Sequence, residues 1–206
     1  VSELVISFAV AMLRHIPATQ REVLSGTWRQ HVGGLLSGRT VGIIGCGFIG
    51  KDLVALLQPW NCTLLANDIL DFSDFYARYS VTPVGLEELL QRSDVVTLHV
   101  PIDESTCNLI SAARLALMKP SAILINAARG GLVDEVALKA MLVTKRLAAA
   151  AFDVFAVEPP QDQELLALPN FLVSPHIGGS AEEATLAMGR AAICGLDDNA
   201  IPEPTD

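Results

Sequence analysis

Residues 40–50 of the chain read TVGIIGCGFIG, and this stretch decides the fold. It begins as a β-branched run, turns at closely spaced glycines, and continues into a helical pattern over residues 49–57. The glycines match the pattern GxGxxG: Gly45 suits a tight turn, Gly47 lets a phosphate group approach the backbone, and Gly50 lets the helix pack closely on the strand. Free N–H groups at the start of a helix favour an anion. We therefore predict a dinucleotide-binding loop here.

An acidic residue follows the next apolar run, at the distance such a loop requires. Asp68 comes just after residues 62–66, about 20 residues beyond the glycines. Its carboxylate would accept hydrogen bonds from ribose hydroxyls. It would also repel a 2′-phosphate, by about 4 kcal/mol for unit charges about 4 Å apart at an effective dielectric of about 20. This predicts NAD rather than NADP as the cofactor. The alternative is that the glycines only make a tight turn and Asp68 is a solvated strand end.

Apolar runs alternate with helical patterns along the rest of the chain. Strands are predicted over residues 62–66, 95–100, 122–125, 149–154 and 171–173, and helices over residues 86–91, 112–118, 136–143 and 181–194. Asp134 and Ser180 stand where N-caps would be. Strands that are apolar on both faces and separated by helices indicate a parallel sheet covered on each side. We predict the α/β class with a doubly wound, Rossmann-type parallel sheet.

The first 38 residues precede this pattern. Residues 2–14 form a helical pattern with a wide apolar stripe, and a second short amphipathic segment ends near Gly26. We predict a helical arm over residues 1–38, a dinucleotide-binding domain over residues 39–196 and a C-terminal tail over residues 197–206.

The composition excludes several classes of function. Of 206 residues, 51% are hydrophobic and 18% are charged, which is typical of a globular domain that folds without disulfides or a metal. The formal net charge of -9 repels phosphate backbones, so we expect no nucleic-acid partner. The apolar runs are shorter than the roughly 20 residues of a membrane span, and the chain does not open with a signal-peptide pattern. We expect a cytoplasmic protein without membrane contact. The 4 cysteines form no CxxC pair, which predicts reduced thiols and no metal site.

Three polar side chains follow the later strands. Arg129, Glu158 and His176 each come after an apolar run, at the sheet edge where the glycine loop also lies. Beside a nicotinamide they suit hydride transfer at the alcohol carbon of a 2-hydroxy acid. Arg129 would bind the substrate carboxylate, His176 would exchange the hydroxyl proton, and Glu158 would orient the imidazole and favour its charged form. Taken singly, they have ordinary alternatives: a surface ion pair, an exposed charge, and a histidine that leads into a helix.

Four segments together resemble the D-isomer specific 2-hydroxyacid dehydrogenase family. They are GIIGCGFIG (residues 42–50), NAARGGLVDE (126–135), FDVFAVEPP (152–160) and SPHIGG (174–179). The resemblance extends over nearly the whole chain and implies that Arg129, Glu158 and His176 are the catalytic Arg, Glu and His. The cofactor-binding residues that we expect are Gly45, Gly47, Phe48, Ile49, Gly50, Asp68, Val100, Pro101, Ala127, Asp153 and Gly178.

Some of these positions carry more detailed expectations from the resemblance. Asp153 matches the acid that contacts the nicotinamide amide, and Val100 and Pro101 match the border of the adenine pocket. Phe48 stands where the family commonly has an arginine, so one possible phosphate contact is missing.

The resemblance also implies a parent enzyme and its partners. Most of the family's substrate domain is absent, so we expect the parent to be an NAD-dependent D-2-hydroxyacid dehydrogenase, similar to phosphoglycerate or hydroxypyruvate enzymes, that acts on a small 2-oxo or 2-hydroxy acid. The chain alone should bind NAD(H) with little turnover. Its first helices resemble dimer-contact helices, which predicts a homodimer through an exposed apolar stripe. One alternative is an NAD-responsive dimeric corepressor-like scaffold. Another is a domain tuned to formate or phosphite, which Glu158 disfavours for formate.

Overall fold

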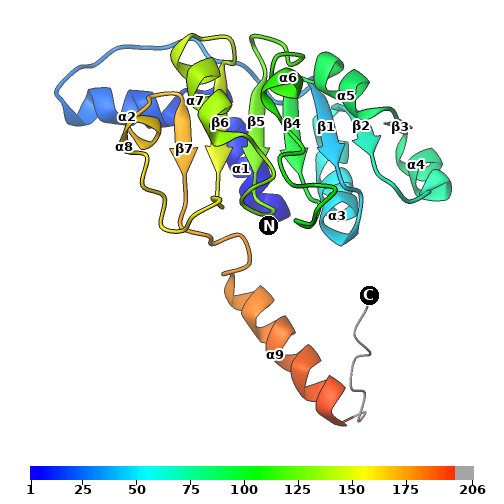
Figure 1. Cartoon of the computed structure of the whole chain (residues 1–206). Coiled ribbons are helices and arrows are strands. Elements are labelled where there is room, and N and C mark those ends of the chain that lie inside the picture. The colour runs from blue at the N-terminus through cyan, green and yellow to red at the C-terminus, as the bar shows by residue number, and fades with distance from the viewer. Residues whose placement is uncertain (198–206) are drawn as a thin grey trace.

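A fully parallel sheet forms the centre of the computed structural model, which describes residues 1–197. Its seven strands are ordered β3-β2-β1-β4-β5-β6-β7 (Figure 1). They are β1 (Thr40–Ile44), β2 (Thr63–Asn67), β3 (Val81–Pro83), β4 (Val95–Leu98), β5 (Ile123–Asn126), β6 (Ala149–Phe152) and β7 (Phe171–Val173). The strand order reverses at β1, which pairs in parallel with both β2 and β4. The predicted doubly wound Rossmann-type sheet is confirmed.

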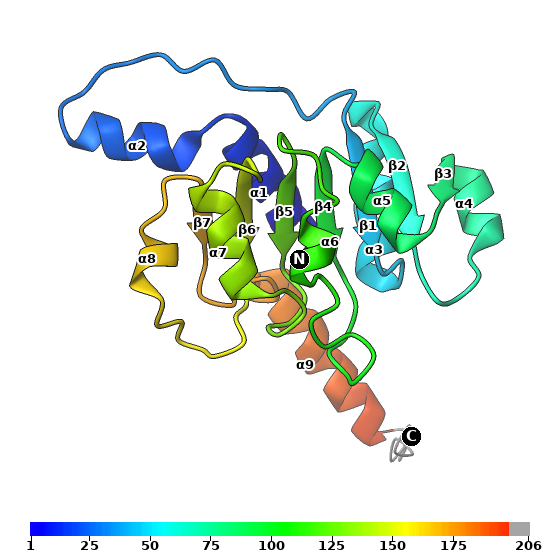
Figure 2. The same ribbon diagram turned by 45° about the horizontal axis from the view of Figure 1, so that its top comes forward.

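Helices cover both faces of this sheet (Figure 2). They are α1 (Ser2–Leu13), α2 (Ile16–Leu24), α3 (Phe48–Leu57), the 3-10 turn η1 (Gln58–Trp60), α4 (Ser73–Tyr79), α5 (Leu86–Arg92), α6 (Ala112–Leu115), α7 (Glu135–Val143), α8 (Gln163–Leu166) and α9 (Glu182–Asp197). One apolar cluster joins α1, α3 and α4 to one face, and a second joins α5, α6, α7 and α8 to the other. The central strands β4, β5 and β6 are therefore buried along their whole length.

The apolar stripe of α1 is buried within the chain itself, which corrects the expectation of an exposed stripe. Val5, Phe8 and Met12 are 3–5% exposed, and α1 packs against α3, β5 and β6. The sheet needs this helix, because without it the face formed by β5 and β6 would lie open to water. The exposed apolar side chains lie further along, in α2 and in the segment of residues 25–38.

Several element ends differ from the predicted ones by one or two residues. The strands predicted to end at residues 100 and 154 end at Leu98 and Phe152, because the chain leaves the sheet there to form loops. The N-cap predicted at Asp134 is confirmed, since its carboxylate accepts the N–H of Ala137 at 2.9 Å. The N-cap predicted at Ser180 is wrong: α9 begins at Glu182, and Ser180 instead closes a turn with its N–H on the carbonyl of Ile177.

Helix α9 projects away from the sheet on the side to which the strands point (Figure 1). Within residues 1–197, no helix has both the length and the apolar character that crossing a membrane would require. Of the predicted C-terminal tail, residues 198–206 lie outside the described part of the chain.

Candidate active site

The glycine loop has the geometry that its sequence pattern predicts. Gly45 has a φ of +91°, and a Cβ there would lie 2.5 Å from the carbonyl oxygen of His99. A Cβ at Gly50 would lie 2.3 Å from the carbonyl oxygen of Gly45, so the helix can approach the strand only without it. At Gly47, the N-cap of α3, a Cβ would meet no atom within 4 Å. The backbone at Gly47 is therefore open, and the space beside it can accept a phosphate group.

Asp68 lies at the end of β2 and faces this loop. One oxygen of its carboxylate accepts the N–H of Cys46 at 2.5 Å, and the other accepts the N–H of Leu70 at 2.9 Å. The half-buried carboxylate is thus held in one orientation beside the loop. This places it where ribose hydroxyls would lie if a dinucleotide followed the loop.

The other residues expected at the cofactor lie near the carboxyl ends of the strands, at the same edge of the sheet as Asp68 and the glycine loop. Phe48 and Ile49 open α3, with exposed fractions of 96% and 37%. Phe48 brings no charge, so phosphate binding here depends on backbone N–H groups. Val100 follows β4 and lies beside the turn, with Cγ1 2.8 Å from the Cβ position at Gly45. Pro101 is exposed next to it, while Ala127, just beyond β5, is buried.

Glu158 and His176 form a hydrogen-bonded pair. The Nδ1 atom of His176 lies 3.0 Å from one carboxylate oxygen of Glu158, and the other oxygen accepts the N–H of Phe155 at 3.1 Å. The hydrogen bond to His176 is the main reason why the pKa of Glu158 lies below its usual value. The hydrogen bond from Phe155 and the nearby charge of Arg129 lower this pKa further. Glu158 is therefore a carboxylate that binds one imidazole nitrogen and leaves Nε2 free to exchange a proton.

This pair lines an open pocket of about 500 Å³. The pocket is otherwise mainly apolar, with Phe155, Leu166 and Val173 among its lining residues. The side chain of His176 is 51% exposed and that of Glu158 is 40% exposed, so both are accessible from this side.

Asp153 is buried beneath the loop that follows β7 and carries His176, with 1% of its surface exposed. One carboxylate oxygen accepts the hydroxyl of Ser174 and the N–H of Ile177, the latter at 2.8 Å, and the other accepts the N–H of Gly178 at 2.7 Å. Both oxygens are therefore engaged by the chain itself. Asp153 therefore anchors the loop that carries His176.

Arg129 is exposed on the loop that follows β5. The loop approaches the segment after β6 so closely that a Cβ at Gly130 would lie 1.8 Å from the carbonyl oxygen of Phe155. The buried side chain of Asn126 stabilises the turn, because its amide donates to the carbonyl of Arg129 at 2.9 Å and its oxygen accepts the N–H of Ala128 at 3.2 Å. Since β5, β6 and β7 are parallel neighbours, Arg129, Glu158 and His176 lie along one edge.

Sequence reasoning did not identify three residues that shape this site. Asn126 and Gly130 determine the path of the Arg129 loop, and Glu135 accepts the N–H of Ala156 at 2.9 Å. All three belong to the NAARGGLVDE segment. The doubled glycine and the asparagine at a strand end were signals of a constrained turn.

The fold and the site together define a class. A doubly wound parallel sheet with a GxGxxG turn and an acid at the end of its second strand is a Rossmann domain that binds a nicotinamide dinucleotide. The chain belongs to the D-isomer specific 2-hydroxyacid dehydrogenase family, whose NAD binding domain matches residues 6–178. NAD is thus the cofactor of this domain.

The relatives include several dehydrogenases and reductases. D-3-phosphoglycerate dehydrogenase of Methanocaldococcus jannaschii is 39% identical over 192 residues, which cover 92% of this chain and 37% of that protein. Hydroxypyruvate reductase of Thermotoga maritima is 37% identical, and the match covers 92% of this chain and 62% of that protein. The structure of a D-lactate dehydrogenase from Sporolactobacillus sp. superposes with a TM-score of 0.88 at 37% identity, over 95% of this chain and 63% of that one. The chain therefore spans between about a third and two thirds of these relatives.

Proposed function

We propose that this domain serves hydride transfer between NAD(H) and a small D-2-hydroxy acid or its 2-oxo acid. The observation that carries the proposal is the hydrogen bond of 3.0 Å between His176 and Glu158, at the sheet edge that also holds the glycine loop. When bound, NAD supplies the hydride acceptor and NADH the hydride donor. Backbone N–H groups at Gly47 and Ile49 would hold the pyrophosphate, and Asp68 the ribose.

The chain's own residues have separate tasks in this proposal. His176 would hold a proton at Nε2 and pass it to the substrate oxygen during reduction, or remove it during oxidation. Glu158 would orient the imidazole through its bond to Nδ1. Arg129 would bind the substrate carboxylate with its planar guanidinium.

The domain alone should turn over little. In the family, as we expect from the resemblance, a second domain closes over the substrate and excludes water. We therefore expect NADH to bind to this chain without measurable oxidation by pyruvate, glyoxylate or hydroxypyruvate. Robust NADH oxidation by the 206-residue chain would contradict this part of the proposal.

Gly47→Ala tests the cofactor loop. The free energy of unfolding should change by less than about 0.5 kcal/mol, because a Cβ there meets no atom within 4 Å of it in this structure. The Kd for NADH should rise about 5- to 150-fold, since a methyl group would occupy the space of the pyrophosphate. NADH fluorescence titration and urea unfolding measure the two effects.

Gly85→Ala provides the matched control for that substitution. Gly85 is also a helix N-cap, with φ of -64° against -69° for Gly47, and a Cβ there likewise meets nothing. It should leave both stability and NADH affinity unchanged. Equal weakening of NADH binding by the two substitutions would argue against a phosphate site at Gly47.

Asp68→Asn tests the choice of cofactor. The wild-type chain should bind NADH more tightly than NADPH, and the substitution should reduce this preference about 10- to 1000-fold by removing the charge that repels a 2′-phosphate. Isothermal titration with both cofactors measures it. Asp71→Asn removes the same charge from an exposed side chain nearby and should leave the preference intact. Equal affinity of the wild-type chain for both cofactors would contradict the role of Asp68.

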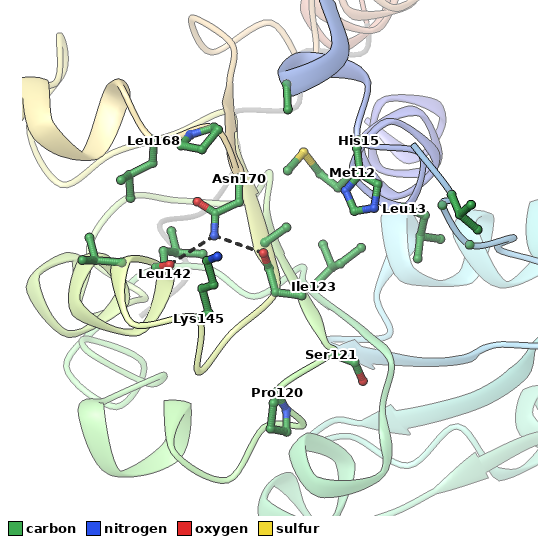
Figure 3. A pocket seen from close by; sticks show the side chains of 18 of the residues that line it. Met12, Leu13, His15, Pro120, Ser121, Ile123, Leu142, Lys145, Leu168 and Asn170 are labelled. Atoms are coloured by element: carbon green, nitrogen blue, oxygen red, sulfur yellow. Dashed lines mark hydrogen bonds between the residues drawn. The ribbon is translucent and has the colours of Figure 1, made fainter. Parts of the chain in front are cut away.

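We also propose a homodimer through the segment of residues 16–35. Large apolar side chains are exposed there, among them Leu24 (79%), Trp28 (86%) and Val32 (97%). Val32 also lines an open groove of about 840 Å³, at the opposite edge of the sheet from the site, with Met12, Leu142 and Leu168 in its lining (Figure 3). Exposed apolar side chains next to an apolar groove favour a second copy as the occupant.

Trp28→Ser is expected to weaken this dimer about 30-fold or more, the effect of losing an aromatic anchor worth about 2 kcal/mol at an interface. Analytical ultracentrifugation over a range of concentrations measures the dimer Kd. Val136→Ser removes a 77% exposed apolar side chain from α7 and should leave it unchanged. A monomeric wild-type chain at high concentration would rule out the dimer.

A further inference from the structure

The peptide segment at Phe155 and Ala156 is the place where the parts of the site meet. It follows β6 and leads to Glu158, in a stretch without helix or strand. The loop of Arg129 lies against it at Gly130, whose Cβ position is 1.8 Å from the carbonyl oxygen of Phe155. The position of this segment therefore determines how Arg129 and Glu158 lie relative to one another.

Two carboxylates hold the consecutive N–H groups of this segment. Glu158 accepts the N–H of Phe155 at 3.1 Å, and Glu135 accepts the N–H of Ala156 at 2.9 Å. Glu135 is the first residue of α7, whose start is fixed by the cap at Asp134. Its side chain is half-buried and connects a rigid helix to an irregular loop. Glu158 binds the same loop on which it stands, so its bond to Phe155 cannot fix the loop relative to the body of the domain, whereas the bond of Glu135 can.

We propose that Glu135 is a positioning residue. By holding the segment at Ala156, it keeps Glu158 where Glu158 can orient the imidazole of His176. The inference rests on the proposed function, in which the pair of Glu158 and His176 handles the substrate proton. The hydrogen bond of Glu135 goes to the N–H of Ala156, so its effect on the imidazole passes through the backbone of this segment. A carboxylate suits this task because it accepts a backbone N–H more strongly than a neutral oxygen does.

The test compares Glu135→Ala with Glu135→Gln in the 206-residue chain, because glutamine keeps an oxygen that can accept the N–H of Ala156. In the alanine variant, amide exchange at Ala156 should become about 3- to 10-fold faster, the factor that one hydrogen bond of ordinary net strength contributes. The pKa of Glu158, followed by carboxyl ¹³C NMR, should rise toward the usual value of a glutamate, because its bonds to His176 and Phe155 loosen. The glutamine variant should retain most of both properties.

Glu88→Ala serves as the control, because it removes the same charge from an exposed site on α5. It should leave amide exchange at Ala156 and the pKa of Glu158 unchanged. An unchanged pKa of Glu158 in the alanine variant would overturn the inference, and so would an equal rise in the glutamine variant.

NADH titration separates this inference from the proposed function. All these variants should bind NADH as the wild-type chain does, because Glu135 stands at the start of α7 and its hydrogen bond goes to Ala156, after β6, rather than to the glycine loop. If the wild-type chain fails to bind NADH, the proposed function fails, while the pKa of Glu158 still reports on Glu135. If NADH binds normally and the pKa of Glu158 does not respond, only the role of Glu135 is refuted.

Discussion

His176→Ala is expected to lower the turnover number for reduction of a 2-oxo acid about 10²- to 10⁴-fold, the range by which positioned acid–base groups accelerate reactions. The measurement is NADH oxidation by this domain joined to a substrate-binding domain, with glyoxylate, hydroxypyruvate and pyruvate as substrates. The large effect is expected because only Nε2 of His176 is free to exchange the proton, while Nδ1 is bound to Glu158 at 3.0 Å.

The affinity for NADH should change less than about threefold in the same variant, which corresponds to less than about 0.7 kcal/mol. Ile177→Ala in the next position controls for disturbance of the loop, and its side chain is 45% exposed. It should retain most of the activity. If His176→Ala abolished NADH binding as well, the histidine would be a structural residue rather than the proton carrier, and the proposed mechanism would be refuted.

Much of the fold was predictable because apolar runs and glycines determine the secondary structure of the segments in which they stand. The β-branched run before Gly45 and the glycine pattern define β1 and α3, and the central strands are apolar on both faces. The elements that sequence reasoning missed, α4, β3 and α8, are short. Strand β3 has three residues at the edge of the sheet and ends at Pro83, so its pattern is too brief to distinguish from a loop.

The apolar stripe on the first helix shows a different limit. A stripe over residues 2–14 predicts that one face of a helix is covered, but not what covers it. Val5 and Phe8 in fact pack on the chain's own sheet. The side chains left exposed, such as Trp28 and Val32, lie in a segment with no periodic pattern, so hydrophobic periodicity could not single them out.

In the candidate site, sequence reasoning could place only the side chains with an expected chemical role, which stand in the loops after the strands. Because parallel strands end at one edge, Arg129, Glu158 and His176 could be assigned to that edge from the order of the runs alone. The supporting residues could not be assigned in this way. The roles of Gly130 and Glu135 depend on the close approach of the loop after β5 to the loop after β6, a contact that exists only once the strands are paired.

Asp153→Asn is expected to cost about 2–4 kcal/mol of the free energy of unfolding, in spite of the nearly equal size of the two side chains. Asp153 is buried and uses both carboxylate oxygens, one for Ser174 and Ile177 and the other for Gly178. Asparagine replaces one oxygen by an NH₂ group, which would face an N–H or O–H donor and leave it unpaired. Because the same loop holds His176 with a φ of +56°, turnover should fall as well. Urea unfolding measures the first effect, and NADH oxidation by the domain joined to a substrate-binding domain measures the second.

Asp103→Asn is the matched control for this substitution. Asp103 also accepts several hydrogen bonds, from Ser105 and Thr106, but they all reach a single oxygen of an exposed carboxylate. Asparagine keeps that oxygen, so the loss should stay below about 1 kcal/mol. If both substitutions cost the same, the effect at Asp153 would reflect the loss of a charge and not the use of both oxygens. The buried carboxylate would then not be the anchor that keeps His176 at its positive φ.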